Sequence, residues 1–136
     1  MKRITARGII FIGNKVVLLK RIRKEKDTYL HYYAIPGGGK EEYESITDTC
    51  IREIKEEVSL DVTIDKYLGK EEYDKGIVYY YKVNYLGGIP TLGGEEKEQN
   101  NKDNYYEVEL IDIKDIDNIF IYGKGIEMIK ESYKYI

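Results

Sequence analysis

Seven acidic side chains lie within residues 37–57, a stretch that begins with three glycines and reads GGGKEEYESITDTCIREIKEE. Like charges three or four residues apart destabilise a helix by about 0.2–0.5 kcal/mol per pair. A sequence tolerates this where water screens the charges or where a divalent cation lies between them. Carboxylate oxygens are the ligands that Mg²⁺ prefers, and Mg²⁺ usually brings phosphate with it. The stretch therefore indicates either a solvated acidic surface or a site for Mg²⁺ and a phosphorylated ligand.

A helix is expected to carry these carboxylates over residues 45–58. Ser45 followed by Asp48 resembles a capping box, which would start the helix. Apolar residues then recur every four positions and form one stripe: Ile46, Cys50, Ile54 and Val58. This spacing predicts that the stripe packs against the core.

The three glutamates near the end of this helix share one side of it. At roughly 100° per residue, Glu53, Glu56 and Glu57 fall within one arc that borders the apolar stripe. We therefore expect them at the edge of a cleft. The run Pro36–Gly39 lies just upstream and predicts a tight turn to which another group can come close.

In register, these residues resemble the Nudix box: Gly, five residues, Glu, seven residues, Arg-Glu, an aliphatic, any residue, Glu-Glu, any residue, Gly, an aliphatic. Eight of the nine fixed positions match, with Ser59 in place of the last glycine: Gly38, Glu44, Arg52, Glu53, Ile54, Glu56, Glu57, Ser59 and Leu60. The departure at Ser59 affects the helix end, where a glycine would adopt φ > 0 cheaply, and a serine there could cost about 1 kcal/mol. It removes no carboxylate.

The resemblance implies an α/β fold, the Nudix α/β/α sandwich with a mixed β-sheet between helices, over residues 1–136 as one domain. It also implies hydrolysis of a nucleoside diphosphate linked to another group, with Mg²⁺ or Mn²⁺ as cofactor. The substrate would be a nucleoside triphosphate, an oxidised nucleotide or an ADP-sugar. An alternative from another class is a non-catalytic domain that senses a nucleotide and regulates a partner, and a third is an acidic interaction helix without metal.

By the same resemblance, Glu56 and Glu57 are the main metal ligands and Glu53 is a ligand or the base. The Gly37 carbonyl is a further ligand. Arg52 is expected to orient the acids through an ion pair with Glu44 or Glu53. Glu44 would then lie behind the ligands rather than among them.

The general base varies in this family, and a distant loop offers other carboxylates. Residues 95–98 read EEKE, which is either a solvated charge run or the source of the base. Glu98 is slightly favoured over Glu95 because of its distance to the following strand.

Several residues are candidates for contact with the substrate: Arg7, Arg21, Arg23, Lys40 and Gly38. Arg21 and Arg23 share one strand face by period two and could face a phosphate together. Exposed strand-edge charges are an equally good interpretation. Aromatic or imidazole rings that could stack on a base precede the glycines: His31, Tyr32 and Tyr33. Core packing or simple exposure is the commoner fate of such tyrosines.

These residues require a scaffold of several strands and two helices. Strands are expected over residues 3–12, 16–23, 32–35, 61–68, 77–86 and 105–113, and a second helix over 125–135. Residues 87–104 show no periodicity and predict a long functional or mobile loop.

Composition limits the partners. The formal net charge is −3, which argues against binding a nucleic acid polymer. No apolar run approaches membrane-spanning length, and the N-terminus lacks a signal-peptide pattern. The single cysteine suits a reducing compartment, so a cytoplasmic monomer or homodimer acting on a small nucleotide is expected.

Overall fold

A computed structural model describes residues 2–136 of the chain. In that range the elements are β1 (Arg3–Ile12), β2 (Lys15–Glu25), β3 (Thr28–Ala34), β4 (Gly37–Gly39), α1 (Ile46–Val58), β5 (Asp61–Tyr73), β6 (Gly76–Gly87), α2 (Gly94–Gln99), β7 (Asn104–Asp112), the 3₁₀ helix η1 (Ile113–Asn118) and α3 (Gly125–Tyr133). None of the helices in this range is long and apolar enough to cross a membrane.

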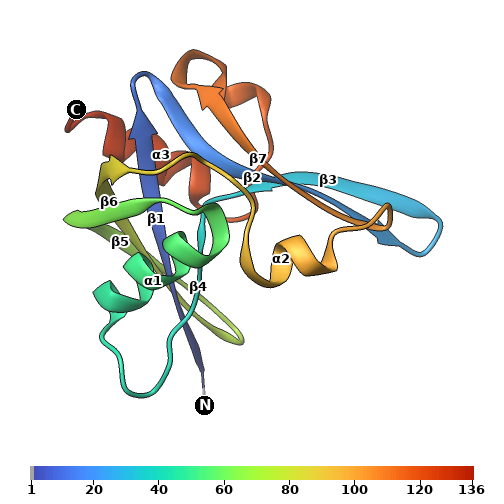
Figure 1. Ribbon diagram of the computed structural model, residues 1–136, viewed down its shortest axis with the longest axis horizontal. Helices are drawn as coiled ribbons and strands as arrows, with labels where there is room; N and C mark the ends of the chain where they lie inside the picture. The colour runs from blue at the N-terminus through green and yellow to red at the C-terminus, as the bar shows by residue number, and fades with distance from the viewer. Residues whose placement is uncertain (1) are drawn as a thin grey trace.

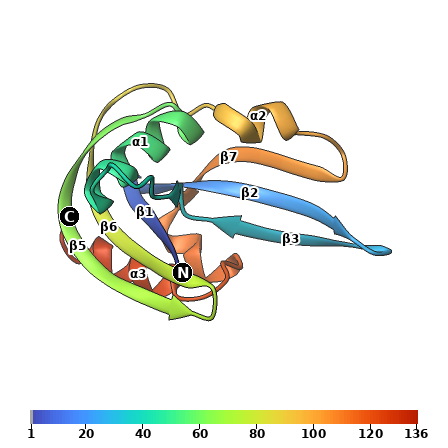
Figure 2. The same ribbon diagram turned by 90° about the horizontal axis from the view of Figure 1, so that it is seen from below.

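The strands form one mixed sheet (Figure 1). The order is β3-β2-β1-β6-β5, with β7 paired to β2 and β4 paired to β1. Strands β1 and β6 run parallel, whereas the other strand pairs are antiparallel. The β2–β3 hairpin and β7 extend away from the β1–β6–β5 part of the sheet (Figure 2).

Helices cover both faces of the sheet, with α1 on one side and α3 on the other (Figure 2). The central strands are therefore buried on both faces. Val17 and Leu19 pack toward α1 with Ile54, whereas Val16 and Leu18 pack toward α3. This period-two alternation of apolar residues builds two cores from one strand. The expected α/β/α sandwich with a mixed sheet is confirmed.

Two sequence expectations were wrong in detail. The Gly37–Gly39 run is a short strand rather than a simple turn, and it pairs antiparallel with β1 at Thr5, Ala6 and Arg7. Residues 87–104 do not form a structureless loop, because they contain the helix α2. The remaining expected strands and both expected helices are present, with ends that differ by a few residues.

Candidate functional site

Helix α1 begins as the sequence predicts. The Ser45 hydroxyl accepts a hydrogen bond from the Asp48 backbone N–H at 3.1 Å, so Ser45 is the N-cap. Cys50, Ile54 and Val58 are fully buried against the sheet. The adjacent side of the helix then carries its glutamates along the edge of this packed face.

The end of α1 is tied to the segment that carries α2. Ser59 adopts the left-handed conformation with φ of 64°. Its hydroxyl donates to the Thr91 carbonyl at 2.9 Å. The backbone N–H groups of Thr91 and Gly93 donate to the carbonyls of Val58 and Glu57, each at 3.0 Å. These bonds satisfy carbonyls that would otherwise be unpaired at a helix C-terminus, and they hold α2 beside the acidic side of α1.

Strand β4 brings the glycine backbone against the glutamates of α1. The Gly37 N–H donates to Glu57 Oε1 at 3.1 Å. A Cβ atom at Gly37 would collide with the Ala6 carbonyl, and one at Gly38 would collide with the Glu53 carboxylate. Glycine is therefore required at Gly37, where the clash is with the backbone, whereas a Cβ at Gly38 would force the Glu53 carboxylate to move.

Arg52 connects the acidic residues to one another. Its guanidinium donates to the two oxygens of Glu44 at 2.6 and 2.9 Å. The same group donates to Glu53 at 3.0 Å, to Glu56 at 3.1 Å and to the Gly39 carbonyl at 3.1 Å. The expected ion pair of Arg52 with Glu44 or Glu53 is present with both.

Glu57 is a buried carboxyl group with few groups that could compensate for the burial of its charge. Only 7% of the residue is exposed, and its one hydrogen-bond donor within residues 2–136 is the Gly37 N–H. Burial raises the pKa of Glu57 to about 8, and the negative charge of Glu96 adds to the shift. Burial also raises the pKa of Glu53, against the opposing effect of Arg52.

This set of donors fits a divalent cation chemically. Several partly buried carboxylates that repel one another are stabilised when a divalent cation binds between them. The described residues do not yet form a ready-made cage of three convergent acidic, His or Cys side chains. Arg52 draws Glu53 and Glu56 toward itself, so these two side chains would have to turn from Arg52 to reach a shared ion.

A cavity of about 240 Å³ lies between β4, α1 and α2. Both positively and negatively charged side chains line it: Arg3, Arg7, Arg21, Glu53, Glu57, Glu95 and Glu96. A second acidic cavity is adjacent, because Glu53, Glu95 and Glu96 line it as well, together with Arg52 and Glu56. A cation held by the glutamates and an anion facing the arginines could occupy this region together.

The predicted anion-binding residues separate into two groups. Arg7 and Arg21 line the cavity, as does the Gly38 backbone. Arg23 does not line it and pairs with Glu25 in an exposed ion pair, and Lys40 donates to the Glu41 carbonyl. Arg23 and Lys40 are thus not brought to the cavity.

Sequence reasoning missed Arg3, which lines the same cavity. A signal existed, because Arg3 and Arg7 are four residues apart on β1 and therefore share one face of that strand.

The carboxylates of residues 95–98 also differ in whether they line the acidic cavities. Glu95 and Glu96 line both acidic cavities, and Glu96 is half-buried. Glu98, the expected base, is exposed and lines neither of them. The sequence could not distinguish these residues, because the orientation of α2 follows from where Gly93 docks on α1.

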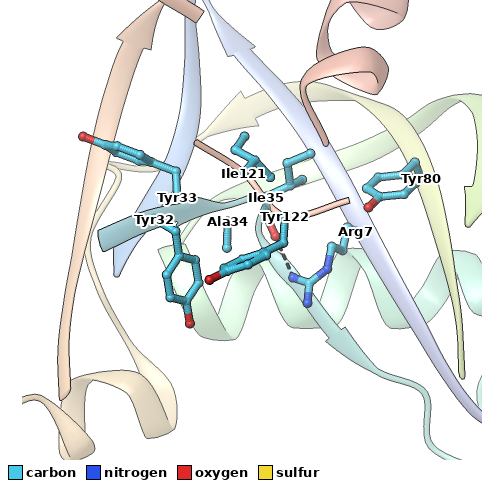
Figure 3. Close-up of a pocket in the computed structure, with 8 residues that line it drawn as sticks. All are labelled: Arg7, Tyr32, Tyr33, Ala34, Ile35, Tyr80, Ile121 and Tyr122. Carbon is cyan, nitrogen blue, oxygen red and sulfur yellow. Dashed lines mark hydrogen bonds between the residues drawn. The ribbon is translucent and has the colours of Figure 1, made fainter. Parts of the chain in front are cut away.

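The rings before the glycines also lie in different places. Tyr32 and Tyr33 line a further cavity that shares Arg7 and Ala34 with the charged one (Figure 3). His31 is exposed on β3.

Comparison with known proteins agrees with this geometry. The family model described as NUDIX domain matches residues 1–122. An ADP-ribose pyrophosphatase of Methanocaldococcus jannaschii is 30% identical over 97 residues, which cover 67% of this chain and 56% of that protein. The chain thus spans little more than half the length of that relative.

Solved structures share the fold at low identity. A NUDIX-family hydrolase of Clostridium perfringens superposes with a TM-score of 0.74 at 18% identity, covering 100% of this chain and 99% of that one. A MutT NUDIX hydrolase of Burkholderia pseudomallei gives a TM-score of 0.72 at 17% identity, covering 94% and 96%. With its glycine strand, its Arg52-linked glutamates and the matching family model, the chain belongs to the NUDIX domain family.

Proposed function

We propose that the protein is a Mg²⁺- or Mn²⁺-dependent pyrophosphohydrolase that cleaves the phosphoanhydride bond of a nucleoside diphosphate linked to another group. The observation that carries the proposal is the buried carboxyl of Glu57, which lines one cavity together with other carboxylates and with arginines. A carboxylate is costly to bury without a compensating charge. A cation bound to a diphosphate supplies that charge, and the arginines match the phosphate.

The residues that would hold the cation are Glu53, Glu56 and Glu57, with the Gly37 carbonyl as a further oxygen donor. When bound, such a cation neutralises phosphate charge and makes a water molecule more acidic. Glu57 is fixed for this role by the Gly37 N–H and by burial. Glu56 is half exposed on its side chain and has a single ion-pair partner among residues 2–136, so it is free to turn toward an ion.

Arg52 holds the remaining acids in place. Because the Arg52 guanidinium binds both oxygens of Glu44, it keeps one orientation when Glu53 and Glu56 turn from it toward the cation. Arg3, Arg7 and Arg21 are placed to bind phosphate oxygens, which are hydrogen-bond acceptors that suit a guanidinium. We assign removal of the proton from the attacking water to Glu96 in place of Glu98, because Glu96 lines both acidic cavities.

The test is Glu57→Gln, with Glu42→Gln as the matched control because Glu42 is exposed and lines neither acidic cavity. Two quantities are measured: the Mg²⁺-induced rise in melting temperature and the release of phosphate from a panel. The panel contains nucleoside triphosphates, oxidised nucleotides, ADP-ribose, nucleotide sugars and dinucleoside polyphosphates. ADP-ribose is included because the Methanocaldococcus jannaschii relative is named for it.

Glu57→Gln should abolish Mg²⁺-dependent hydrolysis and reduce the Mg²⁺-induced melting shift, since a ligand that binds the native state must stabilise it. The metal-free variant should be at least as stable as the wild type, because a neutral amide replaces a buried carboxyl that faces other acids. Wild-type turnover in Glu57→Gln would overturn the proposal. Nucleotide binding without hydrolysis of any panel member by the wild type would favour a sensing domain instead.

A further inference from the structure

Arg21 and Tyr106 are direct cross-strand neighbours in the antiparallel pair of β2 and β7. Arg21 lies on β2 and Tyr106 lies opposite it on β7. The guanidinium carbon of Arg21 lies over the Tyr106 ring, 3.8 Å from the ring centroid. Both residues line the charged cavity between β4, α1 and α2. The ring therefore contacts an arginine to which the proposed function assigns a phosphate.

The side chain of Asn100 fixes the backbone of Tyr106. Its amide nitrogen donates to the Tyr106 carbonyl and its amide oxygen accepts from the Tyr106 N–H, each at 3.1 Å. Asn100 is the C-cap of α2, which lies beside β7 (Figure 2). Because both backbone groups of Tyr106 bind Asn100, Arg21 and Tyr106 form a non-hydrogen-bonded pair of the ladder, the kind in which side chains lie closest together. The strand geometry thus brings the guanidinium onto the ring.

The guanidinium of Arg21 is held by its face more than by its N–H groups. Its one hydrogen bond within residues 2–136 runs from Nη2 to Asn104 Oδ1 at 3.2 Å. Nε is buried and has no acceptor in that range. Among the same residues, no carboxylate forms an ion pair with Arg21. A single hydrogen bond allows a guanidinium to turn, so the Tyr106 ring supplies the second contact that fixes its plane.

Arg52 is held in the opposite way. Its N–H groups donate to Glu44, Glu53 and Glu56 and to the Gly39 carbonyl. Carboxylates that hold an arginine like this occupy the N–H groups with which it would bind a phosphate. An aromatic face holds a guanidinium without using these groups and without neutralising its charge. Arg21 therefore keeps its charge and most of its donors for a ligand in the cavity.

We propose that Tyr106 is a positioning residue: its ring, together with the Asn104 side chain, sets the orientation in which Arg21 binds the diphosphate of the substrate. This inference rests on the proposed function, because that function places the diphosphate in the charged cavity. Tyr106 acts through Arg21, so its contribution is to substrate affinity. A contact of this kind is made in the bound substrate and in the transition state alike, and its loss raises KM with little change in kcat.

The test measures binding of methylenediphosphonate by calorimetry in the presence of Mg²⁺. This diphosphate analogue has an uncleavable P–C–P bridge and carries neither sugar nor base, so its binding depends on neither turnover nor the nucleoside. Tyr106→Leu should weaken binding about 2- to 30-fold, which corresponds to about 0.5–2 kcal/mol at 1.4 kcal/mol per tenfold, the range of a cation–π contact. Tyr106→Phe keeps the aromatic face and should bind the analogue as the wild type does.

Tyr105→Leu is the matched control. Tyr105 precedes Tyr106 on β7, so its side chain lies on the opposite face of the sheet. It lines neither acidic cavity, and its hydroxyl donates to Glu107. This variant should keep wild-type affinity for the analogue. Melting curves show which variants are folded.

Asn104→Ala gives a second measurement that leaves the ring in place. It removes the acceptor of the Arg21 Nη2 hydrogen bond and should weaken binding of the analogue about 2- to 10-fold. Should Tyr106→Leu fail to fold, this variant carries the test by itself, and wild-type affinity in folded Asn104→Ala then contradicts the proposal.

A double-mutant cycle distinguishes positioning from direct contact between the ring and the ligand. In the Arg21→Ala background, Tyr106→Leu should change affinity by less than about twofold, because the group that the ring positions is absent. A ring that contacts the diphosphate itself would cause the same loss in both backgrounds. In steady-state kinetics on the best panel substrate, Tyr106→Leu should raise KM and leave kcat within about twofold of the wild type.

Four results would overturn the inference: a wild type that does not bind the analogue with Mg²⁺, wild-type affinity in folded Tyr106→Leu, an equal loss in Tyr106→Phe and Tyr106→Leu, or an equal loss from Tyr106→Leu with and without Arg21. Failure here is separable from failure of the proposed function. A wild type that hydrolyses phosphoanhydrides with Mg²⁺ yet shows one of these results refutes the positioning role alone. A wild type that binds the analogue through Arg21 and Tyr106 yet hydrolyses nothing refutes the enzymatic proposal and leaves the positioning role in place.

Discussion

Arg52 binds both carboxylate oxygens of Glu44, at 2.6 and 2.9 Å, while the same guanidinium contacts Glu53 and Glu56. Only 6% of the Glu44 side chain is exposed. The hydrogen bonds from Arg52 lower the pKa of Glu44 from 4.5 to about 2, against the opposing effect of burial. Glu44 therefore acts on Glu53 and Glu56 through Arg52, because it fixes the group that they share.

Glu44→Gln should destabilise the protein by about 2 kcal/mol at neutral pH, since Arg52 loses the carboxylate that it binds through two oxygens and keeps only Glu53 and Glu56 as ion-pair partners. A carboxyl whose pKa is lowered by folding stabilises the native state above its unfolded pKa, and this stabilisation is lost as the pH falls. The difference between wild type and variant should thus shrink from about pH 5 to about pH 2. Urea unfolding across this pH range measures it.

Glu42→Gln serves as the control for this experiment, and its stability should follow that of the wild type at every pH. A Glu44→Gln effect of constant size from neutral to acidic pH would contradict the role assigned to the ion pair.

Ser59 is the one position where the family motif and this chain disagree, and its geometry gives a second prediction. An L-residue in the left-handed region costs about 1–2 kcal/mol, and the hydrogen bond from its hydroxyl to Thr91 returns about 0.5–1.5 kcal/mol. Ser59→Gly should therefore leave the free energy of unfolding close to that of the wild type. Ser59→Ala should lower it by about 1 kcal/mol, because alanine keeps the strain and loses the bond.

Urea denaturation of the two variants gives both values. Equal stability of Ser59→Gly and Ser59→Ala would mean that the left-handed conformation carries no cost at this helix end.

The sequence was sufficient for the position of α1 and for the residues on each of its faces, because the information there is local. The cap at Ser45 and the apolar repeat follow from spacing along one helix, as does the acidic arc. The residues that line the cavity depended instead on long-range pairing, since Arg3 and Arg21 come from β1 and β2 and line one cavity because of how these strands pair in the sheet.

The region after β6 was the hardest to predict. Helix α2 has no buried residue and no apolar period that could reveal it. Its position is fixed by backbone bonds from Thr91 and Gly93 to the end of α1. Backbone bonds of this kind leave no signature in side-chain type, which is why the spacing to the next strand favoured Glu98 although Glu95 and Glu96 line the cavities.

Gly38 gives a third prediction, because a Cβ atom there would collide with the Glu53 carboxylate. Gly38→Ala should displace Glu53 and lower kcat by about 100-fold, the order of loss that a misplacement of about 1 Å can cause. Gly87→Ala is the matched control, since a Cβ at Gly87 meets nothing within 4 Å. Steady-state kinetics on the best panel substrate compares them. Full activity in Gly38→Ala would show that Glu53 can act without the space that Gly38 leaves beside its carboxylate.

The last prediction distinguishes Glu96 from Glu98 as the source of the general base. Glu96 lines both acidic cavities, and its charge raises the pKa of both Glu53 and Glu57, so it lies electrostatically close to them. General base catalysis contributes about 10²–10⁴-fold to a rate, and Glu96→Gln should lower kcat by an amount in that range. Glu98→Gln should retain wild-type kcat, because Glu98 is exposed and lines neither cavity.

Melting temperature separates a loss of the base from a loss of the fold. Glu96→Gln removes a like charge near the buried Glu57, so the metal-free variant should melt at or above the wild-type temperature even though its turnover falls. A kcat that falls in Glu98→Gln and persists in Glu96→Gln would contradict this assignment.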